Sequence, residues 1–122
     1  MARTDEYIVE IAKDSEYLGR MTDPTASACV TGVCGDEMEF YLVIEERVIK
    51  EAKFFTRGCL SALICGHIVC QLAAERSVKD ALSISPNDVI ERLYNVGEDH
   101  CHCSILAVSA LQRAVADYLL KK

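Results

Sequence analysis

The strongest constraint on the fold is a run of alternating side chains in the middle of the chain. Over residues 37–45 a large apolar residue occupies every second position, and glutamate, tyrosine or valine occupies the positions between. A period of two indicates a β-strand with one buried face. A second strand is expected over Val48–Thr56, where Ala52 and Phe54 share one face. A tight turn at residues 46–47 makes the two strands an antiparallel hairpin.

The pairing within this hairpin makes a prediction about two cysteines that are distant in sequence. Opposed residues have numbers that sum to about 93 or 94, and the second register sets Phe40 against Phe54, apolar against apolar. Either register brings Cys34 within about one residue of Cys59, at the open end of the hairpin. The two cysteines are therefore expected to be neighbours through strand pairing alone.

Helical patterns flank the hairpin. A short helix is expected over residues 7–12, and another from Cys59 to about Ala74. Capping signals at Ser77 and at Ser85–Pro86 open two short helices. The last helix is expected to begin near Ser104 and to present one apolar face.

The order of these elements defines a fold class. With a short strand at residues 28–30, the chain reads as helix, small antiparallel sheet, then helices, which is an α+β architecture with the helices packed on one sheet face. The chain has 122 residues, the size of one ordinary domain, so a single domain over residues 1–122 is expected.

Composition excludes several classes of function. The chain has 13 basic and 19 acidic residues, a net charge of −6, so it would repel phosphate backbones and anionic lipid surfaces. The absence of tryptophan argues against a base-stacking platform. The longest stretch without charge, residues 58–74, is short and polar for a membrane span. No secretory signal follows Met1, so the protein is expected to be cytoplasmic, with no nucleic-acid or membrane partner.

Cysteine is the most informative residue type. The chain has seven cysteines, an odd number in a protein expected to stay in a reducing compartment, so a disulfide framework is a poor explanation. Three clusters stand out, and each sits at the end of an expected element. They are Cys34-Gly35-Asp36, Gly58-Cys59 and Cys101-His102-Cys103-Ser104.

These clusters are candidates for a metal or iron–sulfur site. If the last helix packs across the open end of the hairpin, Cys34, Asp36, Cys59, His102 and Cys103 converge, and their donors suit zinc or iron–sulfur chemistry. Cys59 and Cys103 are expected at helix N-termini, where the helix dipole stabilises thiolate. For Asp36, the alternative is a turn residue that accepts backbone N–H bonds.

Other chemistry-bearing residues fit structural roles better. Cys65 and Cys70 lie in an apolar helix and are expected in the core, as is Cys29 on a strand. His67 and His100 are expected to be solvated or structural, and Cys101 has no assigned role. The chain has no C-x-x-C pair, which argues against a zinc finger, and no Gly-rich oxyanion loop, which argues against a cysteine hydrolase.

Several short motifs, taken together in their order and spacing, carry a resemblance to a known family. They extend over about residues 7–120, and any one alone would be weak. They are Asp23-Pro24, Cys34-Gly35-Asp36, Ala52-x-Phe54 leading to Gly58-Cys59-x-Ser61-Ala62, His102-Cys103-Ser104-Ile105-Leu106-Ala107, and a final Ala-rich helix with Asp117-Tyr118. In these features the chain resembles the IscU/NifU N-terminal family of iron–sulfur cluster assembly scaffolds.

The resemblance implies a function and a set of ligands. It implies a three-stranded sheet and a non-enzymatic scaffold that builds a transient [2Fe–2S] cluster from iron and from the persulfide sulfur of a cysteine desulfurase, then transfers it to apo-proteins. The family's cysteines correspond to Cys34, Cys59 and Cys103, its aspartate to Asp36 and its histidine to His102, and members also bind zinc there. We expect Cys103 to be the persulfide acceptor, with an accessible thiolate.

Some features depart from the family pattern or stay open. The Leu-Pro-Pro-Val-Lys chaperone motif is replaced by residues 93–97, Leu-Tyr-Asn-Val-Gly, which argues against recognition by the specialised Hsp70. The insertion typical of SufU proteins is missing, which favours the scaffold over a zinc-bound, SufU-like persulfide relay. A structural zinc domain is a third hypothesis, and a homodimer is left open.

Overall fold

The computed structural model describes residues 16–32, 35–57, 60–92 and 101–120. The helix expected over residues 7–12 lies outside these ranges. The described elements are three strands followed by four helices. They are β1 (Ala26–Thr31), β2 (Glu37–Glu45), β3 (Val48–Thr56), α2 (Leu60–Ala73), α3 (Val78–Leu82), α4 (Pro86–Arg92) and α5 (Cys101–Leu120).

The three strands form one antiparallel sheet in the order β1-β2-β3. Phe40 pairs with Phe54 as expected, and their rings lie 6.3 Å apart. A register shift between Val43 and Ile44 then moves the pairing by one residue, so that Glu45 pairs with Val48. Both expected registers therefore occur, one on each side of a β-bulge.

The two-residue turn of this hairpin is made by Glu46 and Arg47. Both have positive φ angles, 54° and 64°. Positive φ at both central positions is the type I′ arrangement, whose twist matches that of the flanking strands. Neither residue is the asparagine or glycine that this turn prefers, so the turn is closed at some conformational cost.

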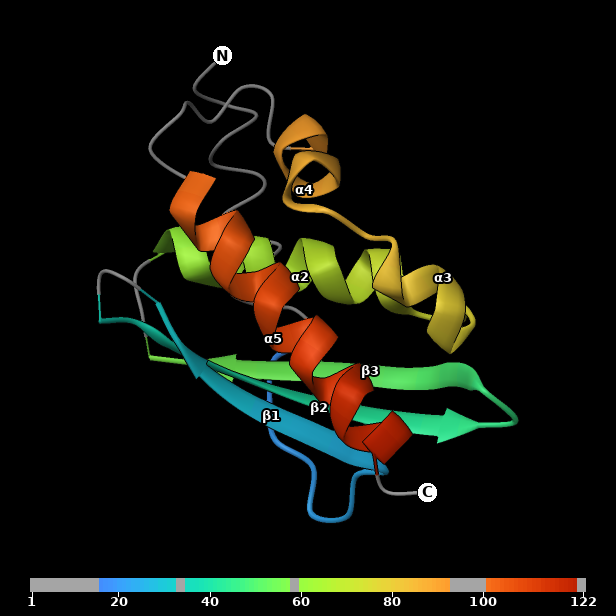
Figure 1. Ribbon diagram of the computed structural model, residues 1–122. Helices are drawn as coiled ribbons and strands as arrows, with labels where there is room; N and C mark the ends of the chain where they lie inside the picture. The colour runs from blue at the N-terminus through green and yellow to red at the C-terminus, as the bar shows by residue number, and fades with distance from the viewer. Residues whose placement is uncertain (1–15, 33–34, 58–59, 93–100, 121–122) are drawn as a thin grey trace.

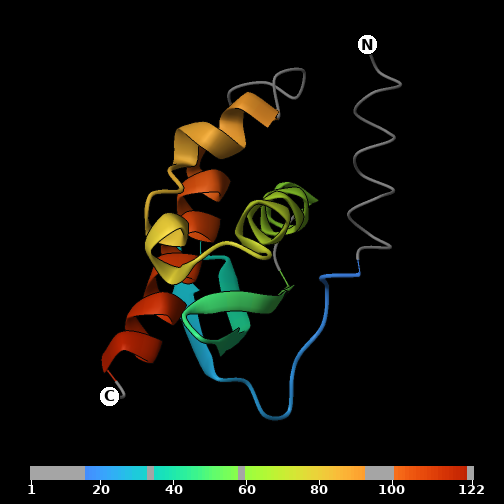
Figure 2. The ribbon, with the colours of Figure 1, turned by 90° about the vertical axis from the view of Figure 1, so that its right-hand side faces the viewer.

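The four described helices cover the same face of the sheet, which confirms the expected α+β layering (Figure 1). Turned by 90°, the molecule shows α2 and α5 lying on one side of the strands (Figure 2). The buried residues of β2, Met38, Phe40 and Leu42, point to this side and are fully inaccessible to solvent. The alternate residues Glu37, Glu39 and Tyr41 face the open side.

Close approach of α2 to the sheet depends on Gly66. A Cβ atom built there would lie 2.4 Å from Cδ2 of Phe54, a ring that is itself fully buried. No side chain fits at this crossing without a shift of the ring or the helix.

The short helices begin where the sequence predicts. The Ser77 side chain accepts a hydrogen bond from Asp80 N–H at 3.1 Å and caps α3. At α4, the Asp88 carboxylate accepts from Ser85 N–H at 2.9 Å.

Helix α5 begins at Cys101, three residues before the expected start near Ser104. Neither glycine nor proline stands between Cys101 and Ser104, so nothing in the local sequence prevents the helix from extending to this point.

Candidate functional site

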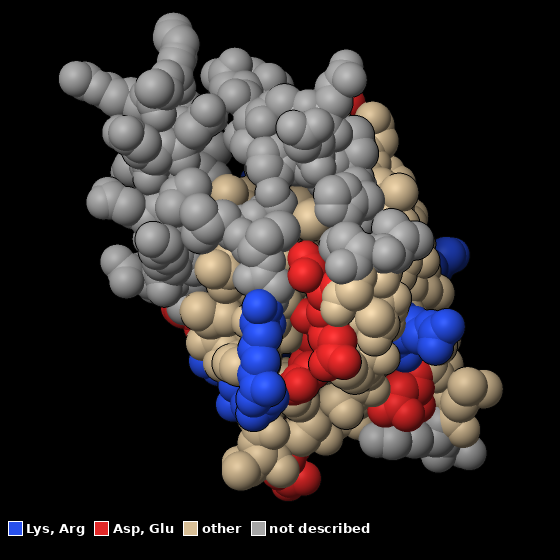
Figure 3. All heavy atoms as spheres, turned by 90° about the vertical axis from the view of Figure 1, so that its left-hand side faces the viewer, with Lys and Arg blue, Asp and Glu red and all other residues tan. Residues whose placement is uncertain are grey.

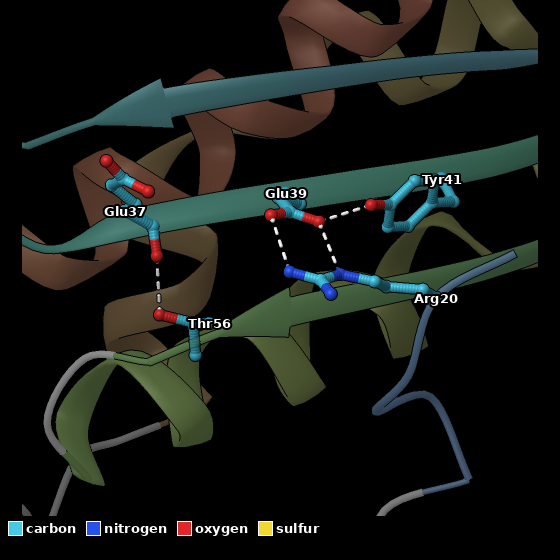
Figure 4. Close-up of polar contacts among 5 residues, drawn as sticks. All are labelled: Arg20, Glu37, Glu39, Tyr41 and Thr56. Carbon is cyan, nitrogen blue, oxygen red and sulfur yellow. Dashed lines mark hydrogen bonds and ion pairs between the residues drawn. The ribbon is translucent and has the colours of Figure 1, made fainter.

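One end of the sheet gathers the chain segments that flank the predicted ligands. Thr56, at the end of β3, pairs with Met38, near the start of β2. The Thr56 hydroxyl also donates to the Glu37 carbonyl at 2.6 Å (Figure 4). The residues just before Cys59 and just after Cys34 are thus held side by side by strand pairing.

The β1–β2 connection is closed by its own backbone. Gly32 N–H donates to the Asp36 carbonyl at 2.8 Å, and Gly35 N–H donates to the Gly32 carbonyl at 3.0 Å. Gly35 has a φ of 92°, a left-handed conformation that favours glycine. Asp36 itself is half-buried and directly precedes β2.

Helix α5 brings the third segment to the same end. A Cβ atom built at Gly32 would lie 3.4 Å from Cδ1 of Leu106, one turn into the helix from Cys103. The start of α5 therefore packs against the β1–β2 connection, which is the packing that the convergence of the clusters requires.

Cys103 differs from its expected state. It is the third residue of α5, within the first turn, but its side chain is fully buried, with 0% exposed. The expected accessible thiolate is therefore wrong for this conformation. The reason is the earlier start of the helix, which makes Cys103 part of an element that packs on the core instead of a loop before it.

The complete ligand set lies partly outside the described residues. Cys34 and Cys59 are outside the described ranges, and the side chain of His102 is not described either. Within the described part of the chain, no three histidine, cysteine, aspartate or glutamate side chains lie close enough to hold a metal ion. The ligand set of Cys34, Asp36, Cys59, His102 and Cys103 stays a prediction.

The open face of the sheet next to this end carries a polar cluster that the sequence analysis did not identify. Arg20 donates two hydrogen bonds to the Glu39 carboxylate, at 3.0 and 3.1 Å, and the Tyr41 hydroxyl donates a third (Figure 4). The Arg20 guanidinium also lies 4.1 Å from the centroid of the Phe55 ring. The Arg57 guanidinium lies 6.0 Å from the same centroid. Acidic and basic side chains gather beside each other on this end of the molecule (Figure 3).

The electrostatics of this cluster follow from its hydrogen bonds. The bond from Arg20, then that from Tyr41, lowers the pKa of the Glu39 carboxyl. Partial burial, followed by the bond to Glu39, raises the pKa of Tyr41. The alternation in β2 predicted that Glu39 and Tyr41 share the open face, but nothing in the sequence indicated that Arg20 folds back onto them.

The remaining cysteines divide into buried and exposed. Cys65 and Cys70 are fully buried, as expected, and burial raises the pKa of the Cys70 thiol well above its usual value. Cys29 was expected in the core and this is wrong, because it lies on the open face of β1 opposite Glu39. Partial burial and then the charges of Glu37 and Glu39 raise its pKa, so its thiol is neutral near pH 7.

His67 was expected to be either solvated or structural, and the structure gives it a structural role. It is largely buried on α2, and its ring meets that of Tyr17 edge-on at 5.4 Å. Burial lowers the pKa of His67. His100 lies outside the described residues, and the side chain of Cys101 is not described.

The described architecture defines a class of protein: an α+β domain with a three-stranded antiparallel sheet, covered on one face by helices, in which Cys103 and the segments that flank Cys34 and Cys59 lie at one sheet end. The sequence profile of the NifU-like N terminal domain matches residues 4–122, so the chain belongs to the NifU-like N-terminal domain family.

Relatives of this chain are named as scaffold proteins. The chain is 32% identical over 109 residues to the iron–sulfur cluster assembly scaffold protein IscU 1 of Archaeoglobus fulgidus, covering 89% of this chain and 66% of that protein. It is 36% identical over 90 residues to the scaffold protein IscU of Escherichia coli, covering 73% of this chain and 70% of that protein. The chain thus spans 66% of the length of the archaeal relative.

Solved structures share the fold. The N-terminal NifU-like protein of Brucella abortus superposes with a TM-score of 0.72 at 17% identity, covering 94% of this chain and 93% of the other. A protein of Fervidobacterium islandicum, described as a candidate scaffold for a SUF system, superposes with a TM-score of 0.67 at 17% identity, covering 90% and 94%.

Proposed function

We propose that this protein is a scaffold on which an iron–sulfur cluster of the [2Fe–2S] type is assembled and then passed to apo-proteins. The observation that supports it most directly is the meeting of three segments at one sheet end. The residues flanking Cys34, those flanking Cys59 and the first turn of α5 with Cys103 come together there, and all three bear cysteine.

The donors at this end suit a cluster that must later be released. In the proposal Cys34, Cys59 and Cys103 supply thiolate, which binds iron tightly, and Asp36 supplies a carboxylate, a harder and weaker match for a cluster. His102 supplies a further nitrogen donor. A mixed set of this kind holds the cluster less firmly than thiolates alone, so transfer to an apo-protein is favoured.

Sulfur is proposed to arrive through Cys103. A Cys103 thiolate attacks the terminal sulfur of a persulfide on a cysteine desulfurase, the sulfur–sulfur bond of the desulfurase breaks, and its own thiolate leaves. A thiol reductant then supplies the electrons that convert this sulfur to sulfide for the cluster. Because Cys103 is fully buried in this conformation, its side chain must become exposed before the attack.

The compartment follows from this chemistry. Free thiols and an oxidisable cluster require a reducing environment, so the protein is proposed to act in the cytoplasm. Helix α5 contains an apolar stretch long enough to cross a membrane, Cys103–Leu120, but half of it is buried against the rest of the fold. A buried face of this kind is typical of the core helix of a water-soluble domain.

Reconstitution tests the proposal directly. The protein is incubated anaerobically with a cysteine desulfurase, cysteine, ferrous iron and a thiol reductant, and iron, acid-labile sulfide and the visible spectrum are measured. Iron and sulfide in equal amounts are expected. Substitution of Cys34, Cys59 or Cys103 by serine should sharply reduce the yield.

Cys29→Ser is the matched control, because Cys29 is an exposed cysteine on the open face of the sheet. It should assemble a cluster as the wild type does. Zinc without sulfide in the wild type would overturn the scaffold proposal in favour of a zinc-bound sulfur relay or a structural zinc domain.

A further inference from the structure

The two edges of the sheet are protected very differently. At the β3 edge, Phe54 N–H donates to the Tyr17 carbonyl and Gly19 N–H donates to the Phe54 carbonyl, both at 2.8 Å. Further along, Ile49 N–H donates to the Arg76 carbonyl at 2.8 Å. Glu75 N–H also donates to the Ile49 carbonyl at 2.8 Å, so the N–H and C=O groups of Phe54 and of Ile49 are both covered by other parts of the chain.

At the β1 edge, alternate residues face outward. Gly32 N–H donates to the Asp36 carbonyl across the β1–β2 pair, so the even-numbered residues of β1 bond to β2, and Ser27, Cys29 and Thr31 direct their backbone groups away. Ser27 N–H donates to the Asp117 carboxylate at 3.2 Å. Within the described ranges, no such cover is found for Cys29 or Thr31. An uncharged edge that is covered only at Ser27 among the described residues is a template for another strand.

Helix α5 runs alongside this edge in the opposite direction (Figure 1). Two contacts fix the alignment: Asp117 lies beside Ser27, and Leu106 beside Gly32. The helix rises 1.5 Å per residue, so residues 106–117 span about 16 Å. The strand rises about 3.3 Å per residue, so residues 27–32 span about the same length, and the two elements stay aligned along this distance. Along the helix axis, Gln112 and Arg113 are then the α5 residues beside Cys29.

The outward side of α5 carries an exposed stripe. Ser109, Gln112, Arg113, Ala116 and Leu120 line a groove of about 600 Å³ along β1, and Ile105 continues their helical spacing. Ile105 is 54% exposed and Leu120 is 84% exposed. These two lie equally far from Gln112–Arg113, about 11 Å along the helix in either direction.

We propose that β1 and the α5 stripe form a two-fold symmetric interface with a second copy of this chain. A two-fold axis at Cys29 pairs β1 with the partner's β1 in antiparallel fashion and joins two sheets into one. The same axis passes level with Gln112–Arg113, so each Ile105 meets the partner's Leu120. A single two-fold rotation therefore pairs the open β1 edge and also buries both exposed hydrophobic residues of α5. This is the self-complementarity that an isologous dimer requires.

The hydrogen bonds of this interface are specified by the outward groups. Cys29 N–H donates to the carbonyl of the partner's Cys29, and Thr31 N–H donates to the carbonyl of the partner's Ser27, each twice by symmetry. To complete these pairs the Asp117 carboxylate of each chain releases Ser27 N–H, which then donates to the carbonyl of the partner's Thr31. Arg113 lies near the axis, where two guanidinium groups repel, so the dimer should tighten when salt is added.

Oligomeric state tests the proposal. Sedimentation velocity is run between about 10 and about 200 µM, where mass action favours association. A dimer of the 13.5 kDa chain is expected. Leu120→Glu and Ala116→Glu should weaken it about tenfold or more, because they place charge at the end of the stripe and about one helical turn from its centre. Leu82→Glu is the matched control: Leu82 is also exposed, but it lies on α3.

Cross-linking locates the axis. Paired Cα atoms in a hydrogen-bonded antiparallel pair lie about 5.5 Å apart, within disulfide range. Diamide, which accepts the two electrons and two protons released by two thiols, should therefore link Cys29 to the partner's Cys29, as mass spectrometry of the digest would show. Three results would overturn the proposal. They are a monomer at about 200 µM, a dimer whose affinity does not change with Leu120→Glu and Ala116→Glu, and a cross-link through another cysteine in place of Cys29.

Discussion

Gly66→Ala is expected to destabilise the fold, although alanine is the better helix former. In an exposed helix this substitution gains about 0.5–1 kcal/mol, because glycine loses more backbone entropy on folding. Here the new methyl group would lie 2.4, 2.5 and 2.9 Å from three carbons of the Phe54 ring. Atoms cannot approach so closely, so the ring or α2 must move.

The expected loss can be estimated from these opposing effects. The Phe54 ring is fully buried and packs against Phe40, so a movement of the ring disturbs the core packing around it. Overpacking a tight core costs about 1–3 kcal/mol. After the helix gain is subtracted, a net loss of about 1 kcal/mol is expected, with an upper bound of about 2.5 kcal/mol. For a domain of this size each kcal/mol lowers Tm by about 4 °C.

Urea denaturation followed by circular dichroism measures the loss. The exposed substitution Gln71→Ala on the same helix is the control and should stay within about 0.5 kcal/mol of the wild type. Phe54→Leu removes the ring, so in that background Gly66→Ala should cost much less, which gives a clear coupling energy. If Gly66→Ala stabilised the wild type by the ordinary helix increment, the proposed contact between α2 and β3 would be refuted.

Three further predictions follow from other features. Asp36→Cys should hold a reconstituted cluster longer and pass it to an apo-ferredoxin more slowly, measured per bound cluster; an unchanged or faster rate would show that Asp36 is only a turn residue. Because burial lowers the pKa of His67, its neutral form stabilises the fold above about pH 6.5, and this stability should be lost as the pH falls through the folded-state pKa. The Tm of His67→Phe should therefore fall less than that of the wild type between neutral pH and pH 5, and parallel curves would contradict this. Arg47→Gly should raise the unfolding free energy by about 0.5–1 kcal/mol, since Arg47 has a positive φ, and a decrease in urea midpoint would argue against the turn assignment.

Local chemistry in the sequence was enough to predict the elements and much of the topology. The alternation over residues 37–45 can only be satisfied by a strand with one buried face, and pairing apolar with apolar then fixes Phe40 opposite Phe54. The serines at 77 and 85 predicted helix starts because their side chains and neighbours satisfy N–H groups within three residues. The same strand register brings the segments flanking Cys34 and Cys59 together.

Tertiary packing decided what the local pattern could not. The face on which Cys29 lies depends on how β1 pairs with β2, because a shift of one residue moves every side chain to the other face. Likewise, Cys103 is buried because α5 begins at Cys101 and packs on the core. Nothing within a few residues of either cysteine encodes these outcomes, since burial depends on which distant surface covers a side chain. The sequence by itself determined the strands, the capped helices and the pairing of the segments that flank Cys34 and Cys59. Only the assembled fold determined that Cys29 is exposed and Cys103 is buried, and it left β1 as an open edge.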